Sequence, residues 1–316
     1  MCLVFVAWRA HPRYRLVVAA NRDEFHGRPT APAAPWEDIA GPPNGEPAAA
    51  RPILAGRDLQ AGGTWLGVTP EGRFAALTNY RGAVPPAVDA PSRGRLVVDF
   101  LRSGAGARDL AREVAREAGR YSGFNLLLAD RDDLLCVTNR GKERAMEISP
   151  GCHGLGNDRL NAPEEKVTGG LAEFRQILRS GFNVEDLFAL LADDEPAGEA
   201  EPGESELARS RSARFIRAEV YGTRSSTVLL VERDGAIAFE ERSFDPRALE
   251  TGRVAFTRPV DGETGFREVG APLLGLPERA TLADRGTRVS AGSGAGRGSV
   301  PRADSVASTA SKRQET

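Results

Sequence analysis

Short apolar runs, rich in β-branched residues, alternate with turn-forming residues along most of the chain. Two such runs separated by a few turn residues predict a β-hairpin. Pairs of this kind occur at Leu3–Trp8 with Arg15–Ala20, Gly63–Thr69 with Arg73–Thr78, Phe124–Ala129 with Leu134–Thr138, and Ser225–Glu232 with Ala236–Glu241. One more short strand is expected to close with His153–Asn157. The pattern predicts mainly antiparallel sheets.

Apolar residues recur at helical spacing in the middle of the chain. This spacing predicts amphipathic helices, which we place at Gly94–Arg102, Ala107–Ala118, Leu171–Leu178 and Val184–Leu191. Hairpins at both ends with helices between them are typical of an α+β fold, in which helices cover the outer faces of antiparallel sheets.

Three segments lack these patterns. Residues 29–52 are rich in Pro, Ala and Gly, which indicates an extended surface loop, and the acidic segment Asp193–Glu206 indicates a flexible insertion. Residues 276–316 are mostly Gly, Ser, Ala and Arg, so they have little to bury and are expected to be disordered. We therefore predict one folded domain over residues 1–275.

Composition excludes several classes of protein. The chain has 316 residues, with 42 basic against 44 acidic residues, so it has no general attraction for nucleic acid or an anionic membrane. No run approaches the ~18 apolar residues of a membrane span, and the first apolar run lacks a basic leader. We expect a cytoplasmic protein without stable membrane insertion. Its three cysteines are an odd number, which does not indicate a disulfide framework.

Cys2 directly follows the initiator methionine at the start of an apolar strand. Its small size favours removal of Met1, which would leave a free α-amino group with a pKa of about 7.7–8.0. That amine can accept the thiol proton, so one residue would supply both nucleophile and base. The alternative is that Cys2 is a small apolar residue that only fills space at the strand start.

A group of polar residues, Asn21-Arg22-Asp23-Glu24, follows the second strand of the first hairpin. Because the two strands are antiparallel, this group is expected beside Cys2. Asp23 is a candidate to hold the α-amino group, and Arg22 is a candidate to stabilise the thiolate. The alternative is a solvated turn.

Asn79, Asn157 and Arg224 are the other candidates for catalytic chemistry. Each asparagine comes just after an apolar strand, and an amide that stabilises an oxyanion typically contributes about 2.7–4 kcal/mol. Asparagine also ends strands commonly. Arg224 precedes a strongly β-forming run, where it could bind a carboxylate, support the nucleophile, or simply pair with an acidic loop residue. No Walker, Rossmann, G-x-S-x-G or metal-binding spacing is present.

Five segments, in order, resemble the NRDE family, which includes the eukaryotic transport and Golgi organisation protein 2. They are MCLVFVAW, AANRDEF, GGTWLGVTPEGRFAALTNYR, GLGNDRLNAPEEKV and YGTRSSTVLLV. The resemblance covers nearly all of residues 1–245. It implies a four-layer αββα sandwich of the N-terminal nucleophile hydrolase type, similar in logic to cysteine acylases that cleave penicillin V and bile-salt amides.

The resemblance also implies roles for individual residues. Cys2 corresponds to the nucleophile and Asp23 to the carboxylate that holds the α-amino group. Asn79 and Asn157 correspond to asparagines near the oxyanion and substrate, and Arg224 to a late arginine near the nucleophile. Polar neighbours in the same motifs form the expected substrate-binding set: Asn21, Arg22, Tyr80 and Arg81.

Two functions follow from these residues. The first is a hydrolase of a non-peptide C–N amide bond, which forms an acyl-enzyme on Cys2 and needs no metal or other cofactor. The second is a carrier without turnover that binds haem or an acylated metabolite in the same pocket, with the Cys2 thiolate as an iron ligand. The expected partner in either case is a small molecule.

Overall fold

The computed structural model describes residues 2–36, 51–81, 90–198, 203, 205–260 and 265–270. These residues belong to one compact unit, Met1–Leu276. The predicted disordered tail at 276–316 lies outside the described residues. None of the helices in the described ranges combines the length and the apolarity needed to cross a membrane.

Sheet A has the strand order β10-β1-β2-β11-β12-β13-β14 within the described residues, and every pairing in it is antiparallel. Its strands are β1 Cys2–Trp8, β2 Tyr14–Phe25, β10 Gly151–Leu155, β11 Tyr221–Glu232, β12 Ile237–Phe244, β13 Glu250–Arg258 and β14 Arg267–Val269. The first and last predicted hairpins meet in its centre, because β11 pairs with β2. Residues about 200 positions apart in sequence therefore lie side by side near Cys2.

Sheet B is also antiparallel and has the order β3-β4-β5-β6-β7-β8-β9 in the described part of the chain. Its strands are β3 Thr30–Trp36, β4 Ile53–Asp58, β5 Leu66–Val68, β6 Phe74–Asn79, β7 Phe124–Ala129, β8 Leu134–Thr138 and β9 Ala145–Glu147. The middle two predicted hairpins are confirmed as β5–β6 and β7–β8.

The prediction of a surface loop over residues 29–52 is wrong where the structure describes that segment. Residues Thr30–Trp36 form β3, and β4 begins at Ile53. β3 contains two prolines, Pro32 and Pro35, yet it is an edge strand of sheet B. An edge strand tolerates proline because only one side of its backbone must pair. Residues 37–50 lie outside the described residues.

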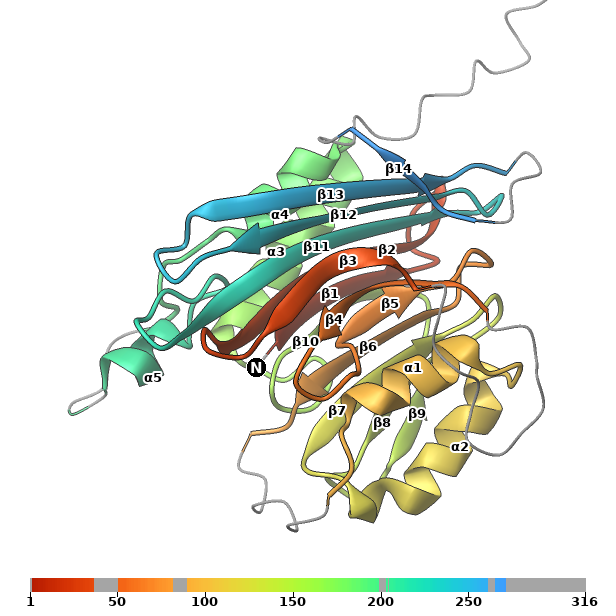
Figure 1. The fold of residues 1–316 in the computed structure, drawn as a ribbon, viewed down its shortest axis with the longest axis horizontal. Coiled ribbons are helices and arrows are strands. Elements are labelled where there is room, and N and C mark those ends of the chain that lie inside the picture. The colour runs from red at the N-terminus through yellow and green to blue at the C-terminus, as the bar shows by residue number, and fades with distance from the viewer. Residues whose placement is uncertain are drawn as a thin grey trace, which may run out of the picture. The chain divides into compact units, whose positions relative to one another are not determined.

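Helices cover the outer face of each sheet, as Figure 1 shows. Their bounds are α1 Gly94–Arg102, α2 Ala107–Glu117, the 3-10 helix η1 Ala118–Arg120, α3 Glu165–Ser180, α4 Val184–Leu191 and α5 Glu206–Ser210. The apolar faces of α1 and α2 pack on sheet B, whereas α3 and α4 pack on sheet A. A third apolar layer fills the space between the sheets. The fold is therefore the four-layer αββα sandwich that the resemblance implies.

Strand alternation decides which way Cys2 faces. In β1, Val4 belongs to the layer between the sheets, whereas Leu3 and Phe5 face the helices, and the Phe5 ring stacks on Phe174 of α3. Successive side chains of a strand point to opposite faces. Cys2 therefore shares the face of Val4 and points into the space between the two sheets.

The acidic segment predicted as a flexible insertion is anchored at its start. The Arg214 side chain donates to the Asp193 carboxylate, with an Nε to Oδ2 distance of 2.9 Å. Arg217 forms an ion pair with Asp194 at 2.7 Å. The end of the segment overlaps α5, which begins at Glu206.

Candidate active site

Cys2 lies at the first position of β1, directly opposite Arg22 of β2. Arg22 in turn lies opposite Ser225 of β11. Cys2 lines a cavity of about 340 Å³, which we call the Cys2 cavity, together with Arg22, Asp23 and Asn79. Four of the nine predicted site residues thus line one cavity.

The Cys2 thiol experiences opposing influences. Its side chain is partly exposed in the cavity wall, yet the residues packed around it remove water, and this burial raises the pKa of the Cys2 thiol. The positive N-terminus, the Arg22 guanidinium and the backbone N–H of Asp23 favour the thiolate and lower the pKa of Cys2, whereas the Asp23 carboxylate adds to the rise. Activation of the thiol therefore depends on these neighbours.

Arg22 is buried within a strand rather than solvated in a turn. Its guanidinium carbon lies 4.2 Å from the centre of the Trp65 ring, and its Nη1 donates to the Thr30 hydroxyl at 2.9 Å. These described contacts include no carboxylate. Burial lowers the pKa of Arg22. The alternative of a solvated turn at this position is wrong, because β2 continues to Phe25 between two partner strands.

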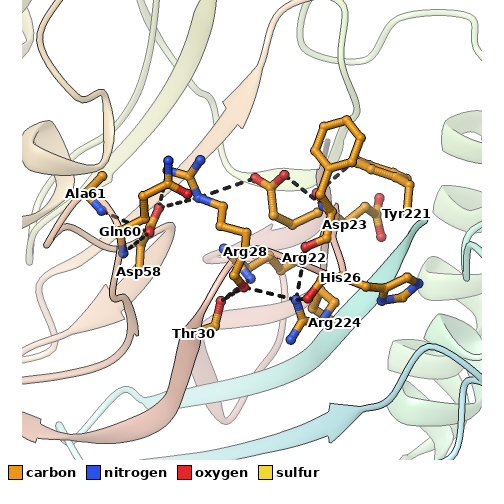
Figure 2. A network of polar contacts seen from close by, with 12 residues as sticks. Arg22, Asp23, His26, Arg28, Thr30, Asp58, Gln60, Ala61, Tyr221 and Arg224 are labelled. Atoms are coloured by element: carbon orange, nitrogen blue, oxygen red, sulfur yellow. Dashed lines mark hydrogen bonds and ion pairs between the residues drawn. The ribbon is translucent and has the colours of Figure 1, made fainter.

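Asp23 is held by residues of β11. The Thr223 hydroxyl donates to Oδ1 of Asp23 at 2.7 Å, and the Tyr221 hydroxyl donates to the main-chain oxygen of Asp23 at 2.9 Å; Figure 2 places Tyr221 beside Asp23. Burial raises the pKa of Asp23, whereas the positive charge of the buried Lys166 in α3 opposes that rise. Asp23 is thus a fixed carboxyl group positioned to hold a cation.

Asn79 and Asn157 meet at the same edge of the sandwich. Asn79 ends β6 and lines the Cys2 cavity. The side-chain amide of Asn157 donates to the main-chain oxygen of Asn79 at 2.9 Å. Asn157 follows the end of β10, whose Leu155 lies opposite Val4, but Asn157 is not among the residues that line the Cys2 cavity. Within the described residues, the buried Oδ1 of Asn157 has no hydrogen-bond partner.

Arg224 lies at a β-bulge and faces a different cavity. Thr223 lies opposite Asp23 and Ser225 lies opposite Arg22, so Arg224 has no partner in the register. Its Nη1 donates to the main-chain oxygens of Phe25, which ends β2, and of His26 and Arg28 in the turn that follows, at 3.1–3.2 Å, as Figure 2 shows. It lines a second cavity of about 380 Å³, which shares Trp65 with the Cys2 cavity. The structure therefore places Arg224 near the site without bringing it into the Cys2 cavity.

The remaining members of the predicted substrate-binding set lie away from the Cys2 cavity. Asn21 is 1% exposed, and its amide donates to main-chain oxygens of Leu191 and Arg214. The Tyr80 hydroxyl bonds to Asp158 at 2.8 Å. Arg81 is exposed and lines a third, smaller cavity. These positions give Asn21 a structural role and do not bring Tyr80 or Arg81 to Cys2.

Glu24 lines the Cys2 cavity as part of the polar group expected beside Cys2, but sequence reasoning missed three other charged residues of the cavity, namely Arg28, Asp58 and Arg93. Arg28 donates to Asp58 through Nε and Nη2, at 2.9 and 2.7 Å, as Figure 2 shows. These residues lie on separate elements, so no local motif connects them.

Two glycines bring the Arg93 segment to the cavity. A Cβ on Gly63 would lie 2.6 Å from the main-chain carbon of Gly94, so the chain can approach this closely only without a side chain there. Gly63 precedes Thr64 and Trp65, and Gly94 follows Arg93 at the start of α1. In the sequence, the adjacent glycines Gly62 and Gly63 are the feature that could have indicated this close main-chain contact.

The other reactive groups offer little competing chemistry. Cys2, Cys136 and Cys152 are all free thiols. Cys136 is buried, and this burial raises its pKa to about 12. Among the described residues, no group of three or more His, Cys, Asp or Glu side chains is arranged to hold a metal ion.

The fold and the site together define a class: a four-layer αββα sandwich whose first strand begins with a cysteine beside an arginine–aspartate pair. The chain belongs to the transport and Golgi organisation 2 family, whose model matches residues 1–246. The family resemblance drawn from the sequence motifs is therefore confirmed.

Relatives with the family name match most of the chain. The Bos taurus transport and Golgi organization protein 2 homolog is 36% identical over 281 residues, which cover 79% of this chain and 97% of the relative. The Homo sapiens homolog is 35% identical over 287 residues, 81% of this chain and 99% of the relative. The Drosophila melanogaster protein is 28% identical over 274 residues, which cover 77% of this chain and 92% of that relative.

Two solved structures are similar at low identity. One is a Caenorhabditis elegans ortholog of N-acylethanolamine-hydrolyzing acid amidase, with 11% identity, coverage of 72% of this chain and 92% of that chain, and a TM-score of 0.44. The other is a C2A mutant of the conjugated bile acid hydrolase from Clostridium perfringens, with 8% identity, coverage of 86% and 97%, and a TM-score of 0.47. Neither similarity is close enough to transfer a function.

Proposed function

We propose that the protein is a cysteine N-terminal nucleophile amidohydrolase that cleaves a non-peptide C–N amide bond through an acyl-enzyme on Cys2. The observation that carries the proposal is the position of Cys2, which begins β1 in the wall of a cavity that Arg22, Asp23 and Asn79 also line. Acyl transfer needs a nucleophile, a base and an oxyanion donor; the Cys2 thiol, its α-amine and the Asn79 amide would supply them, and Arg22 and Asp23 would support the first two.

The reaction begins after Met1 is removed. The α-amine of Cys2 takes the thiol proton, and the sulfur attacks the amide carbonyl carbon. The C–N bond then breaks, and the same amine delivers the proton to the leaving nitrogen. Water attacks the resulting thioester, its proton passes through the α-amine, and the carboxylic acid leaves as the thiol is restored. Atoms balance with water as the only co-reactant.

The neighbouring residues divide the supporting roles. Asp23 holds the protonated α-amine, since its carboxyl group is fixed by Thr223. Arg22 favours the thiolate form of Cys2. The Asn79 amide lines the cavity and is the candidate oxyanion donor, and Asn157 fixes the main chain of Asn79.

Arg224 acts indirectly in this mechanism, through the segment that it holds. It holds the end of β2 and the turn after it through three main-chain oxygens, and that turn follows directly on the strand that carries Arg22 and Asp23. We therefore assign Arg224 a positioning role rather than contact with the reacting atoms.

Haem carriage is supported less well than hydrolysis. A porphyrin presents large apolar faces, and pockets for such ligands are lined mainly by apolar and aromatic side chains. The Cys2 cavity is lined instead by charged residues, among them Arg22, Asp23 and Arg28. These residues favour a small polar substrate.

Intact-mass analysis of the full chain tests the proposal. Wild-type protein incubated with a panel of acyl amides and acyl thioesters is expected to lack Met1 and to accumulate an acyl adduct. Cys2→Ala is expected to form no adduct. Cys152→Ala is the matched control, because Cys152 is also a partly exposed free thiol and its removal should leave the adduct unchanged. Equal labelling of wild type and Cys2→Ala, or retention of Met1 in protein from the native cell, contradicts the proposal.

A further inference from the structure

Two arginines of the Cys2 cavity have no carboxylate among their described contacts. Arg22 is only 5% exposed and contacts the Thr30 hydroxyl and the Trp65 ring. Arg93 donates from Nη1 to the main-chain oxygen of Gly123 at 2.8 Å. Burial lowers the pKa of both arginines, but guanidinium groups stay charged in proteins. Arg22 is thus buried and Arg93 half-buried, and neither guanidinium is hydrogen-bonded to a carboxylate in the described contacts, although Glu24 acts on the charge of both and Asp58 on that of Arg22.

The two guanidinium groups are fixed by different parts of the sandwich. Arg22 comes from β2 in sheet A, and its guanidinium carbon lies 4.2 Å from the centre of the Trp65 ring. Arg93 is the N-cap residue of α1, which packs on sheet B. Both line the Cys2 cavity. An anion in this cavity would meet positive charge from two sides.

The N-terminus of α1 adds to the positive electrostatic potential of the Cys2 cavity. This nine-residue helix has no side-chain cap at its N-terminus and no acidic residue in its first turn. Ser92, Arg93 and Gly94 all line the Cys2 cavity. The N–H groups of Arg95 and Leu96 donate to the main-chain oxygens of Ser92 and Arg93, so the helix dipole is the part of this end that favours a negative group.

Acidic residues also line the cavity, but they have partners of their own. Asp58 receives two hydrogen bonds from Arg28, and Glu24 lies 3.9 Å from the same guanidinium. Arg28 therefore interacts with both carboxylates.

Asp23 is the third carboxyl group of the cavity wall. It accepts the Thr223 hydroxyl and interacts with the charge of Lys166. In the proposed mechanism it also holds the α-amine of Cys2. Glu24 and Asp58 therefore offset part of the positive charge, but in the described contacts no carboxyl group of the cavity hydrogen-bonds to Arg22 or Arg93.

We infer that Arg22, Arg93 and the N-terminus of α1 form an anion subsite beside Cys2, which binds a carboxylate or phosphate group of the substrate. That the bound anion is part of a substrate rests on the proposed hydrolase function, whereas the binding of an anion does not. Charge-assisted hydrogen bonds from guanidinium groups suit both anions. The reacting molecule is therefore an acyl amide that carries a negative group.

Calorimetric titration of the full-length Cys2→Ala protein tests the subsite without turnover. The probes are glutarate, inorganic phosphate and the neutral glutaramide. Glutarate or phosphate is expected to bind, and glutaramide is expected to bind at least 10-fold more weakly. The relative affinities of glutarate and phosphate then distinguish a carboxylate from a phosphate substrate. Equal binding of glutaramide and both anions, or no binding of either anion, overturns the proposal.

Substitutions at Arg93 identify the residue responsible. Arg93→Gln in the same background is expected to weaken anion binding about 10-fold, equivalent to about 1.4 kcal/mol, and Arg93→Lys should restore part of the affinity. Arg95→Gln is the matched control, because Arg95 lies on the same helix and pairs with Asp99 on the exposed face. Unchanged affinity in Arg93→Gln, or an equal loss in Arg95→Gln, contradicts the assignment.

Turnover of a matched substrate pair separates this inference from the proposed function. Glutaryl p-nitroanilide and pentanoyl p-nitroanilide share acyl length and differ in the terminal carboxylate. The subsite predicts at least a 10-fold higher kcat/KM for the glutaryl compound in wild type, and a smaller ratio in Arg93→Gln. Selective anion binding without acylation of Cys2 would refute the hydrolase and keep the subsite. Acylation with no preference for charge would refute the subsite and keep the hydrolase.

Discussion

Asn157 and Asn79 connect the two sheets at the edge of the Cys2 cavity. The Asn157 side-chain amide donates to the main-chain oxygen of Asn79 at 2.9 Å, and the main-chain oxygen of Asn157 accepts from the N–H of Arg81 at 2.6 Å. Asn79 ends β6 in sheet B, whereas Asn157 follows β10 in sheet A. The contact therefore sets the distance between Cys2 and the proposed oxyanion donor.

Replacing Asn157 with Asp should damage both stability and chemistry. The carboxylate cannot donate to the Asn79 oxygen, and two buried oxygens would face each other, which typically costs about 1–3 kcal/mol. Because Asn79 loses its anchor, acylation of Cys2 should slow more than the loss of stability explains. Urea unfolding and the rate of acyl-adduct formation, measured where both proteins are folded, give the two quantities.

Asn183→Ala is the matched control for Asn157→Asp. The Asn183 side chain accepts from the N–H of Asp186 and caps α4, so its loss should cost about 1 kcal/mol of stability. Because α4 does not line the Cys2 cavity, acylation by this variant should keep the wild-type rate. Equal slowing in the two variants would show that the sheet connection has no catalytic role.

Arg22→Gln should make the Cys2 thiol less reactive. Arg22 favours the thiolate, so its removal leaves burial unopposed by that charge and raises the pKa of Cys2 further. Because the thiolate is the reacting species, alkylation of Cys2 at a fixed pH below its pKa should be several-fold slower than in wild type. Iodoacetamide labelling between pH 6 and 9, followed by peptide mass analysis, measures the rate at each cysteine.

Cys152 is an internal reference for this experiment. It is partly exposed and lies near Arg175 and Arg179 rather than Arg22. Arg57→Gln is a matched variant, because Arg57 is exposed and stacks on Trp36 outside the cavity. If Cys2 and Cys152 keep the same relative rates in Arg22→Gln, Arg22 does not activate the thiol.

The sequence was sufficient for the part of the site that depends on one hairpin. Antiparallel pairing of adjacent strands puts Arg22 opposite Cys2, and alternation of apolar residues marks the strands themselves. The two outermost strands β13 and β14, by contrast, carry weak patterns, since only two residues of β13 are fully buried. β3 was missed because a proline-rich edge strand resembles a loop.

Features that depend on tertiary pairing were beyond sequence reasoning. Arg224 follows Thr223, the partner of Asp23, but the bulge between Thr223 and Ser225 leaves it out of the register and in the second cavity. Arg93 reaches the Cys2 cavity only because α1 approaches Thr64 through two glycines. Neither the bulge nor the approach leaves a periodic pattern.

Gly63→Ala should disrupt the approach of α1 to the cavity. The added methyl group would lie 2.6 Å from the main-chain carbon of Gly94, so the start of α1 must move away. Overpacking of this kind typically costs about 1–3 kcal/mol, and Cys2 acylation should slow as Arg93 shifts. Gly119→Ala is the control, because nothing lies within 4 Å of a Cβ there. Equal stability of the two variants would show that the close approach is not required.

Ionisation of Glu241 should lower the free energy of unfolding as the pH rises from about 5 to 8. Burial raises the pKa of Glu241 from 4.5 to about 7, despite hydrogen bonds from the Ala33 N–H and the Thr227 hydroxyl. The folded state therefore binds a proton that the unfolded state has already lost in this range, so stability falls with rising pH through the folded pKa. At about 1.4 kcal/mol per pH unit, the difference amounts to about 3 kcal/mol.

Glu241→Gln isolates this contribution. The amide keeps an oxygen for the Ala33 N–H, so the variant should match wild type near pH 5 and exceed its free energy of unfolding near pH 8. Glu250→Gln is the control, because hydrogen bonds from Arg253 hold the pKa of Glu250 below its ordinary value, and it stays ionised throughout. Urea unfolding at pH 5, 6, 7 and 8 gives the curves. Parallel curves for wild type and Glu241→Gln would show that burial does not shift the pKa of Glu241 into this range, which contradicts the prediction.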